Sequence, residues 1–238
     1  MHVAFSRLLA GNSDPVLIID RVVTQAFELF DGNVKIDVDG FPELACRKNC
    51  PSCCTLRVTA TAPEILLLAH YVRLIEATPS GAQLNLSRRI AEADRATEGL
   101  NEKQRVELSR PCPLILKGVC IVHPVRPLAC RGHASFDRQA CARAAEGHNN
   151  VEVPVSELHL GMRALVQSAL QSALRRSDRA WGLYELNHGL RLALDGNDRR
   201  AAWVRGEDSL APAISDLDAS AMAQTFDALL GTSTVPSA

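Results

Sequence analysis

The chain has 238 residues, of which 47% are hydrophobic, and a formal net charge of −1 from 26 basic and 27 acidic residues. This balance excludes the basic surface expected of a nucleic-acid-binding protein. Six Phe, two Trp and two Tyr also offer few platforms for stacking on single strands. The hydrophobic content is sufficient to bury a core in a chain of this length. We therefore expect a globular protein whose partners do not include nucleic acid.

The location of the protein is predicted from its N-terminus and its apolar runs. Residues 1–10 lack a basic region, and their apolar run is too short for a secretory signal. No stretch reaches about 20 uninterrupted apolar residues, the length needed to cross a bilayer. We therefore expect a cytoplasmic protein with no membrane partner. In that compartment thiols stay reduced, and dense cysteines hold metal more often than they form structural disulfides.

The first predicted elements are a helix and a short β-hairpin. Ser13-Asp14-Pro15 combines a cap donor with proline in the first turn, which predicts a helix over 16–30 that ends at Gly32. Alternation of apolar and polar residues predicts a strand over 34–38, and a second strand is expected over 56–59. If these strands pair, they hold a cysteine-rich loop between them.

Three helices are predicted in the middle of the chain, two of them from capping boxes. Residues 61–64 form one box, and the helix that follows over 65–75 is apolar on nearly every face and should be buried. A more exposed helix is expected over 84–98. The second box, at 101–104, begins a short helix that Pro111 ends.

Three helices are predicted in the C-terminal third, followed by a frayed tail over 232–238. A helix capped by Ser156 carries an apolar stripe that includes Leu158 and Leu165. Two further helices are expected over 181–194 and 216–230, each closed by a glycine.

These elements predict a mainly α fold. We expect a small cysteine-rich, metal-binding region with a short β-hairpin, packed against a helical C-terminal region. The predicted domains are a cysteine-cluster metal-binding domain over 1–150 and a helical region over 151–238. The helical region is also the surface that we expect to meet a protein partner, if there is one.

The cysteines are the strongest chemical signal in the chain. All eight lie within 46–141; the first four are followed by 57 residues without cysteine, and the last 97 residues contain none. Cysteines used only as small buried hydrophobic residues would be scattered. Clustering indicates a shared purpose, and in a reducing compartment that purpose is metal binding rather than disulfide formation. The candidate metal ligands are Cys46, Cys50, Cys53, Cys54, Cys112, Cys120, Cys130 and Cys141.

The number of thiols predicts two sites but leaves the metal open. Zinc and iron–sulfur clusters each take four thiolates, so eight cysteines suit two zinc ions, two clusters or one of each. In extended backbone the neighbours Cys53 and Cys54 would point to opposite faces and serve different sites, or only one of them would bind. A loop with three closely spaced cysteines and more distant later ones favours iron–sulfur slightly over zinc.

Two arginines are candidates for a supporting role around the metal. Arg126 and Arg131 flank Cys130, and a tetrathiolate zinc site carries a formal charge of −2 that their guanidinium groups could offset. The alternative is that they form ordinary ion pairs. His123 can ligate metal, but a lone histidine is more often a packing or hydrogen-bonding residue.

The ordered cysteines resemble a known family. All eight fall on those of the bacterial cysteine-cluster family, described as zinc- or iron-chelating proteins (YkgJ-like) and related to flagellin lysine N-methylases. The chain departs from that pattern in its first spacing, Cys-x3-Cys instead of Cys-x2-Cys, and in having His123 where the family usually has tyrosine. The resemblance covers about residues 46–141 and rests on Cys50-x2-Cys53-Cys54, Cys112-Pro113-Leu114, Cys120-x5-Arg126-Pro127-x2-Cys130-Arg131 and Cys141.

The altered first spacing also matches another pattern. Cys46-x3-Cys50-x2-Cys53 has the spacing of a radical S-adenosylmethionine cluster motif. However, Ser52 stands where that motif has an aromatic residue, and the chain lacks the alternating strands and helices of a (β/α) barrel. We interpret this match as coincidence.

Three functional hypotheses remain from the sequence. The first is a metal-binding protein that holds iron, as an iron–sulfur cluster, or zinc through the eight cysteines. The second, implied only by the resemblance, is an iron–sulfur-dependent protein lysine N-methyltransferase, although no S-adenosylmethionine-binding motif is recognisable. The third is a structural zinc module for protein interaction. Catalytic residues are not identifiable, and whether the protein is an enzyme stays open.

Overall fold

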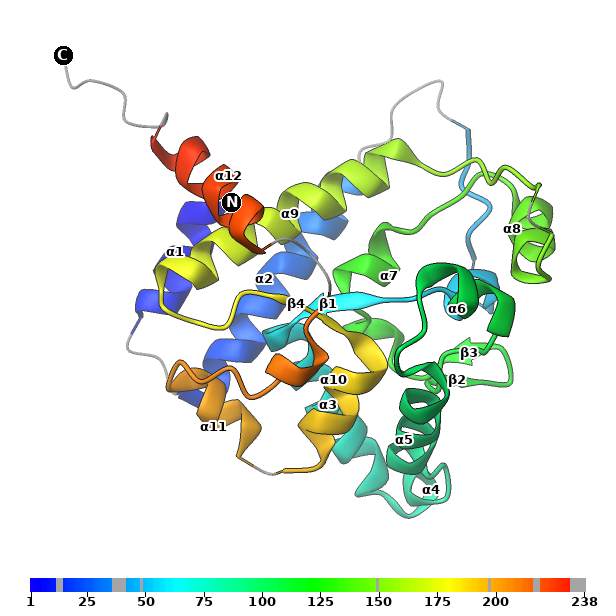
Figure 1. The fold of residues 1–238 in the computed structure, drawn as a ribbon, viewed down its shortest axis with the longest axis horizontal. Helices are drawn as coiled ribbons and strands as arrows, with labels where there is room; N and C mark the ends of the chain where they lie inside the picture. The colour runs from blue at the N-terminus through cyan, green and yellow to red at the C-terminus, as the bar shows by residue number, and fades with distance from the viewer. Residues whose placement is uncertain are drawn as a thin grey trace.

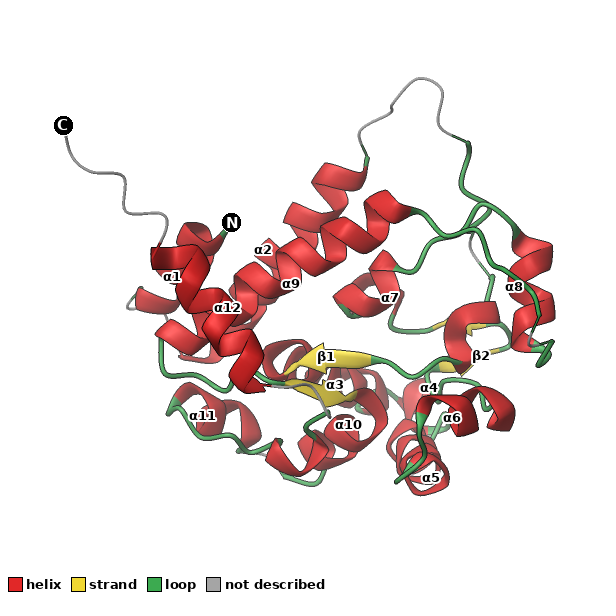
Figure 2. Cartoon of the chain, turned by 45° about the horizontal axis from the view of Figure 1, so that its top comes forward, coloured by secondary structure: helices red, strands yellow, loops and turns green. Residues whose placement is uncertain are grey.

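The protein is mainly helical. A computed structural model has 63% helix and 6% strand, which confirms the predicted fold class at that level (Figures 1 and 2). Within the part of the chain that it describes, no helix is long and apolar enough to cross a membrane. The described residues are 1–11, 15–35, 42–47, 49–148, 150–196, 198–215 and 219–231.

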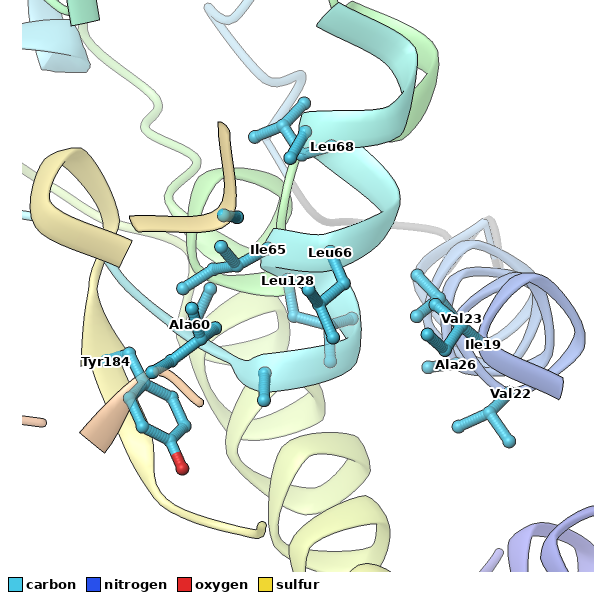
Figure 3. Close-up of a cluster of buried hydrophobic side chains, with 14 of the residues drawn as sticks. Ile19, Val22, Val23, Ala26, Ala60, Ile65, Leu66, Leu68, Leu128 and Tyr184 are labelled. Atoms are coloured by element: carbon cyan, nitrogen blue, oxygen red, sulfur yellow. The ribbon is translucent and has the colours of Figure 1, made fainter. Parts of the chain in front are cut away.

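A bundle of long helices forms the core. Helix α9 packs against α1 and α2, while α3 contacts both α2 and α10. In Figure 3, Ile19 and Val23 on α2 point toward Leu66 on α3, and all three side chains are fully buried or nearly so. The helices of this bundle are α1 (His2–Ala10), α2 (Pro15–Val34), α3 (Ala62–Glu76), α9 (Glu157–Arg176) and α10 (Leu186–Leu194).

Shorter elements surround the bundle. Helices α6 and α8 and the strands β2 and β3 lie at one end of the molecule in both views (Figures 1 and 2). The remaining elements are α4 (Pro79–Ala82), α5 (Leu86–Thr97), α6 (Glu102–Leu108), α7 (Leu128–Gly132), α8 (Arg138–Ala145), α11 (Arg199–Val204), α12 (Ala219–Gly231), the 3₁₀ turns η1 (Ser52–Thr55), η2 (His123–Val125) and η3 (Ala211–Ala213), and the strands β1 (Thr59–Thr61), β2 (Ile115–Leu116), β3 (Val119–Cys120) and β4 (Leu183–Glu185).

The predicted hairpin between 34–38 and 56–59 is wrong. Val34 is the last residue of α2, and residues 36–38 lie outside the described residues. The later strand begins at Thr59 and pairs antiparallel with β4, so that Ala60 lies opposite Tyr184. Both of these residues are buried, and their burial between α3 and the C-terminal elements selects a partner far away in the chain. The predicted helix over 181–194 accordingly contains β4 before α10 begins.

A hairpin does form, but later in the chain. Strands β2 and β3 pair antiparallel, with Ile115 opposite Cys120. The turn residues Lys117 and Gly118 have φ values of +48° and +80°, the left-handed conformation that a two-residue hairpin turn requires. This hairpin carries one of the candidate ligands.

Both predicted capping boxes are confirmed, with Glu64 returning to the backbone of Thr61 and Gln104 to that of Asn101. The predicted cap at Ser13 and Asp14 lies outside the described residues, and α6 ends at Leu108, before Pro111. The helix expected over 84–98 is α5, and Gly99 has a positive φ of 72° just after its end. These contacts join residues three apart in the chain, so local sequence is sufficient to specify them.

Other helix predictions need correction at their ends and faces. Helix α2 continues past Gly32 to Val34. The apolar stripe predicted on α9 is partly wrong, because Leu158 is 40% and Leu165 is 53% exposed. Helix α9 is covered by α1, α2 and α7 on the face that carries Val166 and Leu170, and the predicted stripe extends beyond that face. Residues 216–218 of the last predicted helix lie outside the described residues.

A single hydrophobic core crosses the predicted domain boundary at residue 150. It includes Ile65 from the first predicted region and Leu170 from the second, both fully buried. Gly132 of α7 also lies so close to α9 that a Cβ there would be 2.5 Å from Cβ of Arg163. The division into 1–150 and 151–238 describes where the cysteines occur, and as a domain boundary it stays a prediction.

Candidate metal centre

The eight cysteines lie on short elements and connecting segments outside the central bundle. None is in a disulfide; Cys46 is exposed and the other seven are half-buried. Among the described residues, no three side chains of Cys, His, Asp and Glu converge as a formed coordination sphere. Two cysteines stand on η1, and one each on β3, α7 and α8.

Backbone pairing places Cys46 near α8 and η1. The N–H of Ala45 donates to the carbonyl of Ser135 at 2.9 Å, and the N–H of Ser135 donates to Cys46 Sγ at 3.4 Å. Three residues after Ser135, α8 begins, and this helix carries Cys141 and packs against η1, which carries Cys53. Segments that are distant in the chain, and that carry these three cysteines, therefore lie next to one another.

Ionisation of one of these thiols affects the pKa of its neighbours. Burial raises the pKa of Cys46, and neighbouring Cys53, Cys50 and Cys141 raise it further because each thiolate would repel another. The N–H of Ser135 opposes this shift by donating to the sulfur. The first four-residue neighbourhood thus consists of Cys46, Cys50, Cys53 and Cys141.

A second neighbourhood forms around Cys112. The N–H of Cys112 donates to the carbonyl of Cys54 at 2.7 Å, which ties the segment before the hairpin to η1. The carbonyl of Cys112 in turn accepts from the N–H of Ile115 at 3.1 Å, and Ile115 lies opposite Cys120 across the hairpin. Three cysteines are therefore connected through consecutive backbone contacts.

Electrostatics adds Cys130 to this second neighbourhood. Burial raises the pKa of the Cys130 thiol, and Cys112, Cys53 and Cys120 raise it further. Burial also raises the pKa of Cys112 to about 11, with Cys120 contributing in the same direction. These thiols would be neutral in the absence of a cation, so a bound metal would have to displace their protons.

Cys53 and Cys54 join the two neighbourhoods. They are consecutive on a 3₁₀ turn, not on extended backbone as we assumed from the sequence. Interaction with the neighbouring thiol lowers the pKa of Cys53 to about 7 and raises that of Cys54. Ionised Cys112 and Cys130 would raise the pKa of Cys54 further, as Cys53 does.

Arg126 lies beside both neighbourhoods. Its positive charge lowers the pKa values of Cys53, Cys120 and Cys130. Its Nη1 donates to Nε2 of His123. Arg126 therefore stands where a charge-neutralising residue is expected, and His123 contacts this arginine.

Arg131 contacts Asp31, two backbone carbonyls and an aromatic ring. Its guanidinium donates to both carboxylate oxygens of Asp31, at 2.8 and 3.1 Å, and to the carbonyl oxygens of Arg126 and Pro124, at 3.0 and 2.5 Å. It also stacks over Phe27 at 3.9 Å from the ring centroid. Arg131 thus forms the ion pair that the sequence left open as an alternative, and it holds the backbone that presents Arg126.

The sequence did not indicate two residues that support the thiols. Arg89 on α5 donates to the carbonyl of Ile115 at 2.8 Å and lowers the pKa of Cys112. Glu64 accepts the N–H of Leu128 at 2.7 Å and so anchors the start of α7, two residues before Cys130. Arg89 lies on a helix expected to be exposed, and Glu64 was recognised only as a cap.

A buried ion pair lines both a cavity and a groove. Arg105 Nη2 lies 2.8 Å from Glu185 Oε1, with side chains 6% and 15% exposed. The cavity, of about 20 Å³, also reaches Cys54 and Cys112. The open groove, of about 700 Å³, has a lining that includes Asp94 and His188. His188 Nδ1 lies 3.0 Å from Asp94 Oδ1.

Comparisons with protein-family models, curated proteins and solved structures found no match to the chain.

Replacing Glu64 by glutamine tests how α7 is held. The two Glu64 oxygens accept from Leu128 N–H and from the N–H and hydroxyl of Thr61, and an amide has only one accepting oxygen. We expect the free energy of unfolding to fall by about 1–3 kcal/mol near neutral pH, measured by urea denaturation. Glu107 is exposed and lies 3.9 Å from Lys103 in an ion pair that serves as the control. Glu107→Gln removes this pair and should change the free energy of unfolding by less than about 1 kcal/mol.

Glu64→Gln should also change how the free energy of unfolding depends on pH. Burial raises the pKa of Glu64, against the opposing hydrogen bonds of Leu128 and Thr61. The folded protein therefore keeps this proton at pH values where the unfolded chain has lost it, and the contribution of Glu64 to stability falls as pH rises from about 4.3 toward the raised pKa. Glu64→Gln should remove this decline. An identical pH profile in both proteins would contradict it.

Proposed function

We propose that this protein binds metal through its eight cysteines and belongs with the YkgJ-like cysteine-cluster proteins. The supporting observation is that eight thiols from 46–54, 112–120, 130 and 141 are gathered on neighbouring elements, without a disulfide, instead of being buried singly in the core. Soft thiolates select zinc, copper(I) and iron–sulfur clusters over hard cations such as magnesium. The metal is iron, as an iron–sulfur cluster, or zinc.

The local structure suits ligands that are ordered by a metal. No side chain of η1 or η2 is buried, the hairpin residues are half-buried, and α8 buries only Ala140. Such segments have little apolar surface to hold them in place, so thiol positions can adjust when an ion binds. The donor set and its surroundings therefore fit a thiophilic metal.

The cysteine-rich part, with its β2–β3 hairpin, is proposed as the metal-binding region, packed against the helices of the C-terminal part. We place the protein in the cytoplasm, because unpaired thiols at this density persist in a reducing compartment. Its partners are a metal ion or cluster and, through the C-terminal helices, another protein, with no role for nucleic acid or membrane.

Anaerobic purification tests the proposal. We expect stoichiometric metal by elemental analysis, and for iron–sulfur a brown protein with broad visible absorption and acid-labile sulfide. Colourless protein with zinc would select zinc and exclude the cluster. Protein that has no metal, that takes up neither zinc nor iron with sulfide when reduced, and whose eight thiols all react with a thiol reagent would contradict metal binding.

A further inference from the structure

We infer that the eight thiols form two four-thiol metal sites that meet at the Cys53–Cys54 peptide. This inference rests on the proposed metal binding and adds which cysteines act together. The first site consists of Cys46, Cys50, Cys53 and Cys141, and the second of Cys54, Cys112, Cys120 and Cys130.

The first site is assembled by η1, α8 and the segment that precedes η1. The sulfur of Cys46 accepts from the N–H of Ser135, which lies just before α8. Helix α8, which carries Cys141, packs against η1. Cys50 lies two residues before η1, and its thiol is 4.0 Å from the Ser52 hydroxyl. The segments that carry Cys46, Cys50 and Cys141 therefore adjoin the turn that carries Cys53.

The second site is assembled by the hairpin and α7. The contact between Cys112 N–H and the Cys54 carbonyl places the start of this segment against η1. The hairpin returns Cys120 opposite Ile115, which is itself bonded to Cys112. Glu64 fixes the start of α7, and Arg131, next to Cys130, donates to the carbonyls of Pro124 and Arg126 in the segment that follows the hairpin.

The position of Arg126 suits two adjoining sites. It lies between η2 and α7, in the segment that joins Cys120 to Cys130, and Arg131 holds its backbone carbonyl. Two tetrathiolate sites with divalent ions would carry a formal charge of about −4 together, and a cation at the junction offsets the repulsion between them.

Cobalt(II) titration of reduced, metal-free protein tests the division, because Co²⁺ replaces zinc in tetrahedral thiolate sites and absorbs in the visible. The parent should bind about two Co²⁺ per chain. A same-group pair, Cys46→Ser/Cys141→Ser, should keep one full tetrathiolate spectrum. A cross-group pair, Cys141→Ser/Cys120→Ser, should keep none, although it removes the same number of thiols. Retention of a tetrathiolate site in the cross-group pair, or its loss in the same-group pair, would overturn the division.

A second measurement uses the unaltered protein, so folding of the variants does not limit the test. Protein loaded with one equivalent of Co²⁺ is alkylated, and protected thiols are mapped by mass spectrometry. Protection should fall on complete groups, so that Cys46 and Cys141 are protected together, as are Cys112 and Cys120. Protection of mixed sets would overturn the division. Failure of the parent to bind Co²⁺, zinc or iron at all would instead overturn the proposed function.

Discussion

Removing the metal with a chelator is expected to release the cysteine-bearing segments while the helical bundle stays folded. Backbone amides in 49–56 and 138–146 should exchange with deuterium at least about 100-fold faster in the metal-free protein, since each factor of ten corresponds to about 1.4 kcal/mol of opening free energy. The reason is the near absence of buried side chains on η1 and α8, in contrast to the many buried side chains of α2 and α3.

Hydrogen–deuterium exchange by mass spectrometry measures this difference segment by segment. Amides of α2, α3 and α9 provide the internal control, because buried apolar side chains of the bundle itself cover these helices. Adding metal back to the same sample should restore slow exchange. Equal acceleration in the bundle and in the cysteine segments would show that the metal stabilises the whole fold. No acceleration anywhere would show that metal binding does not stabilise either part.

Replacing Glu185 by glutamine is expected to destabilise the protein by about 3–5 kcal/mol, the usual cost of removing one partner from a buried ion pair. The change leaves the charge of Arg105 buried and unpaired, in contact with the cavity that reaches Cys54 and Cys112. Glu185 also accepts the N–H of His188 at 2.8 Å and caps α10, so the start of that helix is weakened as well.

Urea denaturation measures this loss, and the chain offers a matched control. Glu207→Gln removes the partner of Arg205 from an ion pair of the same 2.8 Å length whose side chains are 53% and 56% exposed. It should cost less than about 1 kcal/mol because solvent screens an exposed pair. The double variant Arg105→Met/Glu185→Leu should recover most of the stability, since neither charge is then left buried alone. A cost below about 1 kcal/mol for Glu185→Gln would show that water compensates Arg105.

The sequence by itself determined the features that depend on near neighbours in the chain. Capping boxes at 61–64 and 101–104 were correctly located, because a cap joins residues only three apart. The mainly helical fold followed from apolar residues at helical spacing. The number and clustering of the cysteines, and with them the hypothesis of metal binding, were also visible without any structure.

Only the tertiary structure decided which distant segments meet. The pairing of β1 with β4 depends on Ala60 and Tyr184 being buried together, and no local pattern encodes that partner. The orientation of Arg131 toward Asp31, and the contact between α8 and η1, arise in the same way. Apolar burial is non-directional and acts between any residues that the chain brings together, so these contacts follow from the packing of the whole molecule.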